Sequence, residues 1–131
     1  MIGLDTNVLV RYMMQDDSRQ SPLATRIVES LSAESPGFVP LVAIVELGWV
    51  LSSAYELERN QLVEAFEALL RTKELVVERG EIVWKALRLF QRANGDFADC
   101  LIACSAEAAG CAKTMTFDRG AVKSGGMTLI A

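Results

Sequence analysis

The sequence of 131 residues contains no histidine. Histidine is the side chain that most often acts as a general base near neutral pH, and it is a common zinc ligand. Its absence excludes catalysis by histidine acids and bases, Ser-His-Asp triads and His-ligated zinc sites. Any chemistry in this chain must therefore use other groups, and carboxylates are the most abundant ones.

Basic residues are outnumbered by acidic ones. The chain has 13 Lys and Arg against 17 Asp and Glu, which gives a formal net charge of −4. Such a protein does not hold nucleic acid by bulk electrostatic attraction. If it binds nucleic acid, a local positive charge must be present, and a bound cation would supply one.

Long apolar runs and secretion features are also missing. No stretch reaches the ~20 apolar residues of a membrane span. The N-terminus lacks the basic and apolar regions of a signal peptide, because Asp5 comes almost at once. The odd cysteine count of three fits a reducing compartment, so we expect a cytoplasmic protein. We expect ordinary buried thiols at all three positions, Cys100, Cys104 and Cys111.

Short apolar segments alternate with amphipathic ones along the whole chain, which contains 51% hydrophobic residues. The pattern predicts strands at residues 2–4, 38–40, 74–78, 113–118 and 127–131. It predicts helices at residues 7–14, 18–32, 41–57, 61–72, 81–93 and 94–110, the last after turn residues, with a turn region at 119–126. Alternation of this kind indicates an α/β fold with a mainly parallel sheet and helices on both faces. The length indicates a single domain, residues 1–131.

The helical periodicity also predicts which faces are buried. Ser18 is a plausible N-cap of the second helix. The expected buried faces are Leu23, Ile27, Val28 and Leu31 on the second helix, Leu62, Val63, Phe66, Leu69 and Leu70 on the fourth, and Ile82, Val83, Ala86, Leu87 and Phe90 on the fifth.

Asp5 and Glu46 occupy positions that are unusual for an acid: one at a sheet edge where ligands bind, the other in an apolar helix where burial of its charge is costly. Asp5 ends the first strand, at the sheet edge where α/β proteins bind ligands, although it could simply cap the next helix. Glu46 lies on the stripe Val42–Glu46–Val50 of an apolar helix, so we expect it to be buried, which needs a partner or a role. The alternative is that the Glu46 side chain reaches solvent along a hydrated helix interface or pairs with an arginine.

Three further acids lie towards the C-terminus. Asp96 and Asp99 are three residues apart at a predicted helix start and point to the same side, although acids there also favour the helix dipole. Asp118 follows the strand TMTF, on the rim expected for Asp5, although aspartate is also common in turns such as FDRG. Carboxylates brought together repel unless a cation lies between them, and oxygen-only ligands suit Mg²⁺ or Mn²⁺.

Four segments, IGLDTN, VELGWVL, DFADCLIA and TFD, occur in an order that resembles the PIN-domain ribonucleases, and among them the VapC-type toxins of bacterial toxin–antitoxin pairs. The likeness runs from Ile2 to the closing strand. Its specific parts are DTN after a short strand and D-x-LIA at a helix start. The resemblance implies a PIN-like three-layer α/β/α sandwich with a mainly parallel central sheet.

The resemblance also implies residue roles. The catalytic, metal-ligating acids would be Asp5, Glu46, Asp99 and Asp118. The supporting residues would be Thr6, Asn7, Asp96 and Thr116, which would orient the carboxylates or a metal-bound water. Asp96 could instead be a better ligand than Asp99.

The implied function is that of a metal-dependent endoribonuclease, the toxin of a type II toxin–antitoxin system, in which metal-activated water hydrolyses RNA phosphodiester bonds. The cofactor would be one or two Mg²⁺ or Mn²⁺ ions. The partners would be structured RNA with exposed loops, a cognate antitoxin protein and a second copy in a homodimer, with no membrane. Candidate phosphate contacts are Arg11, Arg19, Lys85, Arg88, Arg92 and Arg119, although solvated helix faces are the more common place for any one of them.

Other functions remain open. The chain could be a PIN-type nuclease of RNA processing without toxicity, or a degenerate PIN fold that acts only as a binding module. A receiver-like or phosphatase-like Mg²⁺ domain is a third possibility, although DTN lacks the second aspartate of a D-x-D pattern.

Overall fold

The computed structural model describes residues 1–93 and 95–131, so the expected turn residue Asn94 lies outside the described residues. The chain forms two compact units, Met1–Glu78 and Arg79–Ala131, whose mutual placement is not determined, and each is described by itself. A single PIN-like domain over residues 1–131 therefore stays a prediction. No helix in the described parts of the chain is long and apolar enough to cross a membrane.

The first unit is built on a three-stranded parallel sheet. Its strands are β1 (Ile2–Gly3), β2 (Gly37–Val39) and β3 (Leu75–Val77), with β2 in the middle. The carboxyl ends of parallel strands lie at one edge of a sheet, and Asp5 follows β1 at this edge. The predicted α/β class with parallel strands is confirmed.

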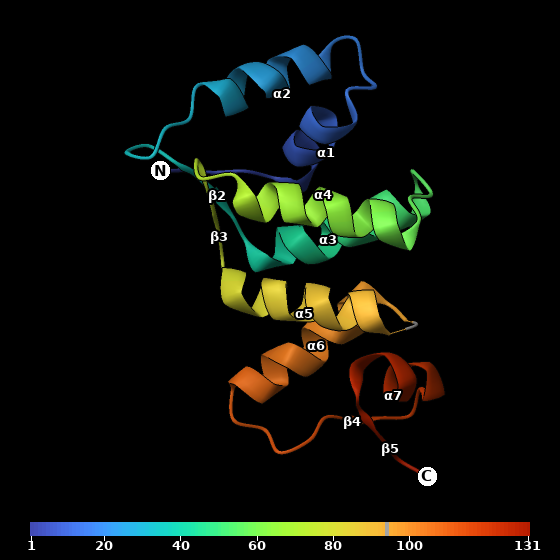
Figure 1. The fold of residues 1–131 in the computed structure, drawn as a ribbon. Coiled ribbons are helices and arrows are strands. Elements are labelled where there is room, and N and C mark those ends of the chain that lie inside the picture. Colours follow the sequence, from blue (N-terminus) through green and yellow to red (C-terminus); the bar gives the residue numbers. More distant parts are fainter. Residues whose placement is uncertain (94) are drawn as a thin grey trace. The chain divides into compact units, whose positions relative to one another are not determined.

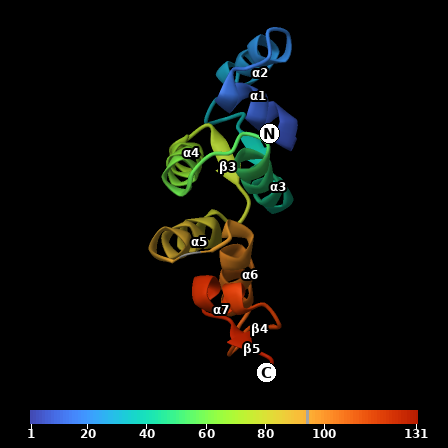
Figure 2. The ribbon, with the colours of Figure 1, turned by 90° about the vertical axis from the view of Figure 1, so that its right-hand side faces the viewer.

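Four helices accompany this sheet: α1 (Thr6–Met14), α2 (Gln20–Glu29), α3 (Leu41–Ser53) and α4 (Arg59–Arg71). Figure 2 shows α3 and α4 on either side of β3, so helices flank the sheet as predicted. The most deeply buried side chains of the unit include Leu9, Ile44 and Phe66. On α4 the predicted face is confirmed, with Leu62, Val63, Phe66 and Leu69 buried and Leu70 half-buried.

The predicted start and buried face of α2 are partly wrong. Asp17, not Ser18, binds the helix start, because its Oδ1 accepts hydrogen bonds from the backbone N–H of Arg19 at 3.0 Å and of Gln20 at 2.7 Å. The helix packs on α1 and buries its small residues, Ser21 and Ala24, together with Val28. Leu23 and Ile27 are exposed, since the close approach of α2 to α1 uses small side chains rather than the largest apolar ones.

The middle strand leaves no room for a side chain at Gly37. A Cβ atom there would lie 2.8 Å from Leu4 Cδ1, 2.9 Å from Leu31 Cδ1 and 3.2 Å from Leu75 Cδ2. We expect Gly37→Ala to lower the free energy of unfolding by about 1–3 kcal/mol, because three leucines must move at once. Urea denaturation measures this. Gly3→Ala, on the neighbouring strand with nothing within 4 Å, is the control, and equal effects of the two substitutions would contradict the packing argument.

The second unit begins with two closely packed helices, α5 (Gly80–Arg92) and α6 (Phe97–Ala108) (Figure 1). The ring of Phe90 meets that of Phe97 edge-on, with centroids 5.7 Å apart. The predicted face of α5 is confirmed, since its five residues are buried: Ile82, Val83, Ala86, Leu87 and Phe90.

A small parallel pair, β4 (Met115–Thr116) and β5 (Thr128–Leu129), completes this unit. The two strands are joined by α7 (Arg119–Gly125), where the sequence predicted only a turn. Two parallel strands need a crossover, and a helix is the usual one. The start and stop features were present, because Asp118 caps α7 and Gly126 ends it in the left-handed conformation at φ 67°.

Candidate active site

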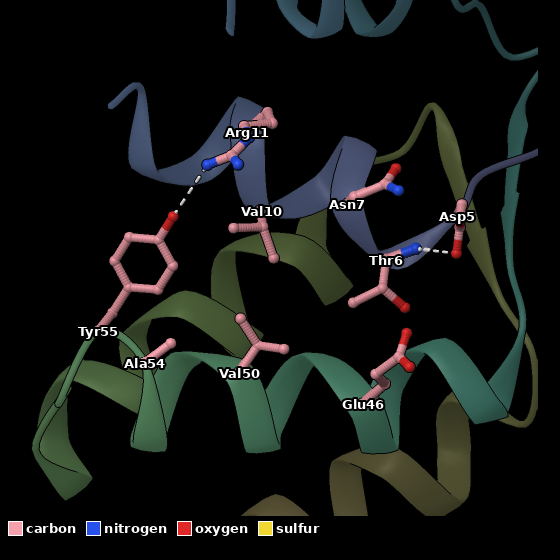
Figure 3. A pocket seen from close by; sticks show the side chains of 9 residues that line it. All are labelled: Asp5, Thr6, Asn7, Val10, Arg11, Glu46, Val50, Ala54 and Tyr55. Carbon is pink, nitrogen blue, oxygen red and sulfur yellow. Dashed lines mark hydrogen bonds between the residues drawn. The ribbon is translucent and has the colours of Figure 1, made fainter. Parts of the chain in front are cut away.

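An open pocket of about 540 Å³ lies in the first unit, between α1 and α3. Figure 3 shows that Asp5, Thr6 and Glu46 gather at one end and that Arg11 and Tyr55 lie at the other. Its lining residues are Asp5, Thr6, Asn7, Val10, Arg11, Glu46, Val50, Ala54 and Tyr55. Four of the predicted site residues, two acids and two supporting residues, therefore share one cavity.

Asp5 is both the cap of α1 and part of the pocket lining. Its Oδ1 accepts a hydrogen bond from the backbone N–H of Thr6 at 2.7 Å, which fixes the carboxylate at the start of the helix. The positive end of the helix dipole favours an anion at this place. The capping role left open by the sequence is confirmed, and it leaves the exposed carboxylate beside the cavity.

The predicted burial of Glu46 is wrong, because its side chain is exposed. The buried face of α3 consists of Ala43, Ile44, Leu47, Gly48 and Leu51, and Val42 on the expected stripe is 78% exposed. In Figure 3 the Glu46 carboxylate points from α3 towards Thr6 of α1. Glu46 thus reaches the pocket from a solvated face, and its charge needs no buried partner.

The opposite end of the pocket holds a polar cluster. Arg11 donates from Nε to Gln20 Oε1 at 2.8 Å and from Nη1 to Asp16 Oδ1 and to the Tyr55 hydroxyl, both at 3.3 Å. The Tyr55 hydroxyl in turn donates to Asp16 Oδ2 at 2.8 Å, and this hydrogen bond raises the pKa of Tyr55. Tyr55 is not among the residues predicted for the site, because nothing in the local sequence relates it to an arginine 44 residues earlier.

The second unit holds the remaining predicted acids. Asp96 caps α6 by accepting from the backbone N–H of Ala98 at 2.8 Å, and Asp118 caps α7 by accepting from that of Gly120 at 2.8 Å. The Thr116 hydroxyl accepts from the backbone N–H of Asp118 at 3.0 Å, so Thr116 positions the chain at this acid. Asp96 thus lies at a helix start, where the helix dipole favours an acid, as its alternative interpretation expected. Asp118, whose alternative interpretation was a turn residue, instead caps a helix.

Asp99 lies in the first turn of α6 and is half-buried. Its pKa is raised above the ordinary value of 3.8, first by burial and then by the charges of Asp96 and Asp118. The second unit therefore brings the carboxylates of Asp96 and Asp118 close enough for their charges to act on Asp99. This is the repulsion that a bound cation would relieve.

The structure thus gathers Asp5, Thr6, Asn7 and Glu46 in one unit and Asp96, Asp99, Thr116 and Asp118 in the other. Among the described residues, no group of three or more acids or cysteines is arranged to hold a metal ion. A site made of Asp5, Glu46, Asp99 and Asp118 draws on both units, and it stays a prediction.

The other candidate residues lie mostly on helix surfaces. Lys85 forms an ion pair with Glu107 at 2.7 Å, and the Arg88 guanidinium lies 4.9 Å from the centre of the Trp84 ring. Arg19, Arg92 and Arg119 are exposed. Cys100 and Cys104 are buried as expected, whereas the expectation for Cys111 is wrong, because it follows the end of α6 in an exposed turn.

Comparison with known proteins identifies the family of the chain. The chain is 28% identical to the VapC ribonuclease of Aquifex aeolicus (strain VF5) over 126 residues, which cover 96% of this chain and 93% of that protein. Residues 2–125 match the PIN domain. The expected PIN-like fold class is confirmed, and the chain belongs to the PIN domain family.

Proposed function

We propose that this protein is a metal-dependent endoribonuclease of the VapC type, the toxin of a type II toxin–antitoxin system. The observation that carries the proposal is the placement of Asp5 and Glu46, from two different elements, at the same end of an open pocket. The similarity to a VapC ribonuclease over nearly the whole chain supports the same conclusion.

The donor chemistry fits a divalent cation. Asp5, Glu46, Asp99 and Asp118 offer only carboxylate oxygens, the ligands that Mg²⁺ and Mn²⁺ prefer. The raised pKa of Asp99 supports the fit, because crowded carboxylates gain from a cation among them. One or two bound ions would lower the pKa of a water molecule and neutralise charge on the scissile phosphate.

The chain's own residues would orient these carboxylates. The hydrogen bond from the Thr6 backbone holds Asp5, and those from Gly120 and Ala98 hold Asp118 and Asp96. Each of the three acids lies at the start of a helix, where the helix dipole favours a negative charge. Thr116 fixes the chain at Asp118, and Asn7 adds a polar group to the pocket wall.

The proposal includes the expected partners and location. The substrate would be structured RNA cut at exposed loops, and the protein would work in the cytoplasm as one PIN-like domain in a homodimer. A pocket of about 230 Å³ between α1 and α2, lined in part by Leu23, Ala24 and Ile27, offers an apolar surface for an antitoxin. The exposed stripe Val42, Val45 and Trp49 on α3 offers another for a second copy.

The test is cleavage of end-labelled total RNA by the purified protein with Mg²⁺ or Mn²⁺, and then with EDTA. We expect discrete cuts that disappear with EDTA and in Asp5→Asn, which keeps an acceptor that can cap α1. Glu64→Gln, on an exposed face of α4, is the control and should cut normally.

Metal-independent cuts, or unchanged cutting by Asp5→Asn, would contradict the proposal. Metal-dependent cutting without growth arrest on expression would favour the RNA-processing nuclease. RNA or protein binding without cuts would favour the binding module.

A further inference from the structure

The polar cluster at the far end of the pocket has no role in the metal chemistry. It consists of Arg11, Asp16, Gln20 and Tyr55, which are joined by hydrogen bonds of 2.8–3.3 Å. Arg11 uses Nε and Nη1 in these bonds, and no hydrogen bond within the described residues uses its Nη2. The guanidinium is therefore held in place and still has donors left for a ligand.

Tyr55 contacts both charged residues of the cluster, Arg11 and Asp16. Its hydroxyl donates to Asp16 and accepts from Arg11, so one oxygen links the α1–α2 region to the segment after α3. A phenol is protonated at neutral pH and can donate, and the hydrogen bond to Asp16 raises the pKa of Tyr55 further. Loss of this hydroxyl would remove one of the three hydrogen-bond partners of the guanidinium without removing its charge.

The cluster lies at a fixed distance from the acids. Arg11 follows Thr6 by five positions in α1, which corresponds to a rise of about 7.5 Å along the helix axis. Both residues line the same pocket, with the acids at the opposite end from Arg11. Such a distance can be spanned by one nucleotide step of an extended single strand.

We propose that Arg11, positioned by Tyr55 and Asp16, binds an RNA backbone phosphate next to the scissile one. The inference rests on the proposed function, since it takes the acid end of the pocket as the place of cleavage. Guanidinium groups form paired, charge-assisted hydrogen bonds with phosphate oxygens. Arg11 is the single base among the residues that line this pocket, and the overall charge of the chain is negative. It is thus the local positive charge that binding requires at this end.

Asp16 has two opposing effects on this contact. It holds Arg11, and its carboxylate also repels a phosphate. The pair is partly solvated, with 31% of the Arg11 and 42% of the Asp16 side chain exposed. Asparagine at this position would keep one oxygen acceptor, for the Tyr55 hydroxyl. It would lose the ion pair with Arg11 and, with it, the negative charge that repels a phosphate and partly neutralises the guanidinium. Asp16→Asn should therefore tighten RNA binding, which a purely structural role for Asp16 would not produce.

The test measures binding of a fluorescein-labelled 12-nucleotide single-stranded RNA in EDTA, as a function of salt. We expect Arg11→Gln to raise Kd about 10-fold or more and to reduce the salt slope by about 0.7. Tyr55→Phe should raise Kd about 3-fold or more with the salt slope nearly unchanged. In cleavage with Mg²⁺, Tyr55→Phe should raise KM and leave kcat unchanged, and Arg11→Lys should restore the salt slope but only part of the affinity.

Matched controls separate this contact from general charge effects. Arg26→Gln and Glu64→Gln change an exposed base and an exposed acid outside the pocket and should barely alter Kd. The tightening by Asp16→Asn should vanish in the Arg11→Gln background. Thermal melts of every variant establish that it is folded.

The proposal is overturned if the wild-type chain does not bind the probe, or if Arg11→Gln weakens binding no more than Arg26→Gln does. It is also overturned if Asp16→Asn tightens binding equally without Arg11. Because the binding arm contains no metal and needs no cleavage, its result stands apart from the proposed function. An Arg11 effect in a protein that cuts no RNA would support the phosphate site and reject the nuclease.

Discussion

Replacing Asp99 by asparagine is expected to abolish RNA cleavage and to leave the metal-free fold at least as stable as that of the wild type. Loss of residues that merely support metal ligands costs about 10–100-fold in activity, so loss of a ligand should cost more than about 100-fold. The free energy of unfolding should not fall, because the substitution removes a negative charge that is partly buried and repelled by Asp96 and Asp118. Cleavage assays and thermal melts in EDTA measure the two effects.

The sign of the stability effect follows from proton linkage. The folded chain holds the Asp99 proton more firmly than the unfolded chain, whose pKa is the ordinary 3.8. The wild type therefore loses stability as the pH rises from 3.8 through the raised pKa, and above it the ionised Asp99 destabilises the fold. Asparagine does not ionise. The melting temperature of Asp99→Asn should thus match the wild type in acid and exceed it near neutral pH.

Asp96 provides a matched control three residues earlier. Its carboxylate accepts the hydrogen bond from Ala98 N, so Asp96→Ala removes a cap and should lower the free energy of unfolding by about 1 kcal/mol. A chain that unfolds on Asp99→Asn, or that melts lower near neutral pH, would make Asp99 a structural residue and remove it from the site.

The sequence predicted elements well where polarity marks one side of a helix. On α4 and α5, charged residues alternate with apolar ones, and the buried faces follow the period of the helix. On α3, apolar residues occur nearly all around, so periodicity could not assign Glu46 to a face. In the structure the small residues Ala43 and Gly48 lie on the buried face of α3, and Glu46 lies on the exposed face.

The candidate site was predictable to a similar extent. Asp5 and Asp118 follow strands, as predicted, and each caps the helix that comes next. Their positions could be predicted because an apolar strand followed by a capping residue is a local pattern of the sequence. The Arg11–Tyr55 contact was not predictable, because it joins residues 44 apart that only the packed fold brings together. The helix α7 was not predicted although its start and stop residues are visible in the sequence, since the glycines in residues 119–126 favour a turn.

Neighbouring residues on α3 should separate function from stability. Glu46 is exposed at the pocket, whereas Leu47 has 0% of its surface exposed. We expect Glu46→Gln to lower cleavage more than about 100-fold and to change the free energy of unfolding by no more than about 0.5 kcal/mol. We expect Leu47→Ala to cost about 2–5 kcal/mol, because the cavity it leaves can close only in part, and to keep cleavage per folded molecule.

The comparison is made by urea denaturation and by cleavage at a temperature at which both variants are folded. Because the two positions are adjacent on one helix, a general disturbance of α3 would affect both properties in both variants. Full cleavage by Glu46→Gln would remove this carboxylate from the site and leave Asp5 alone at that end of the pocket. Lost cleavage in folded Leu47→Ala would instead mean that the core of α3 sets the position of Glu46 closely enough for a cavity to misplace it.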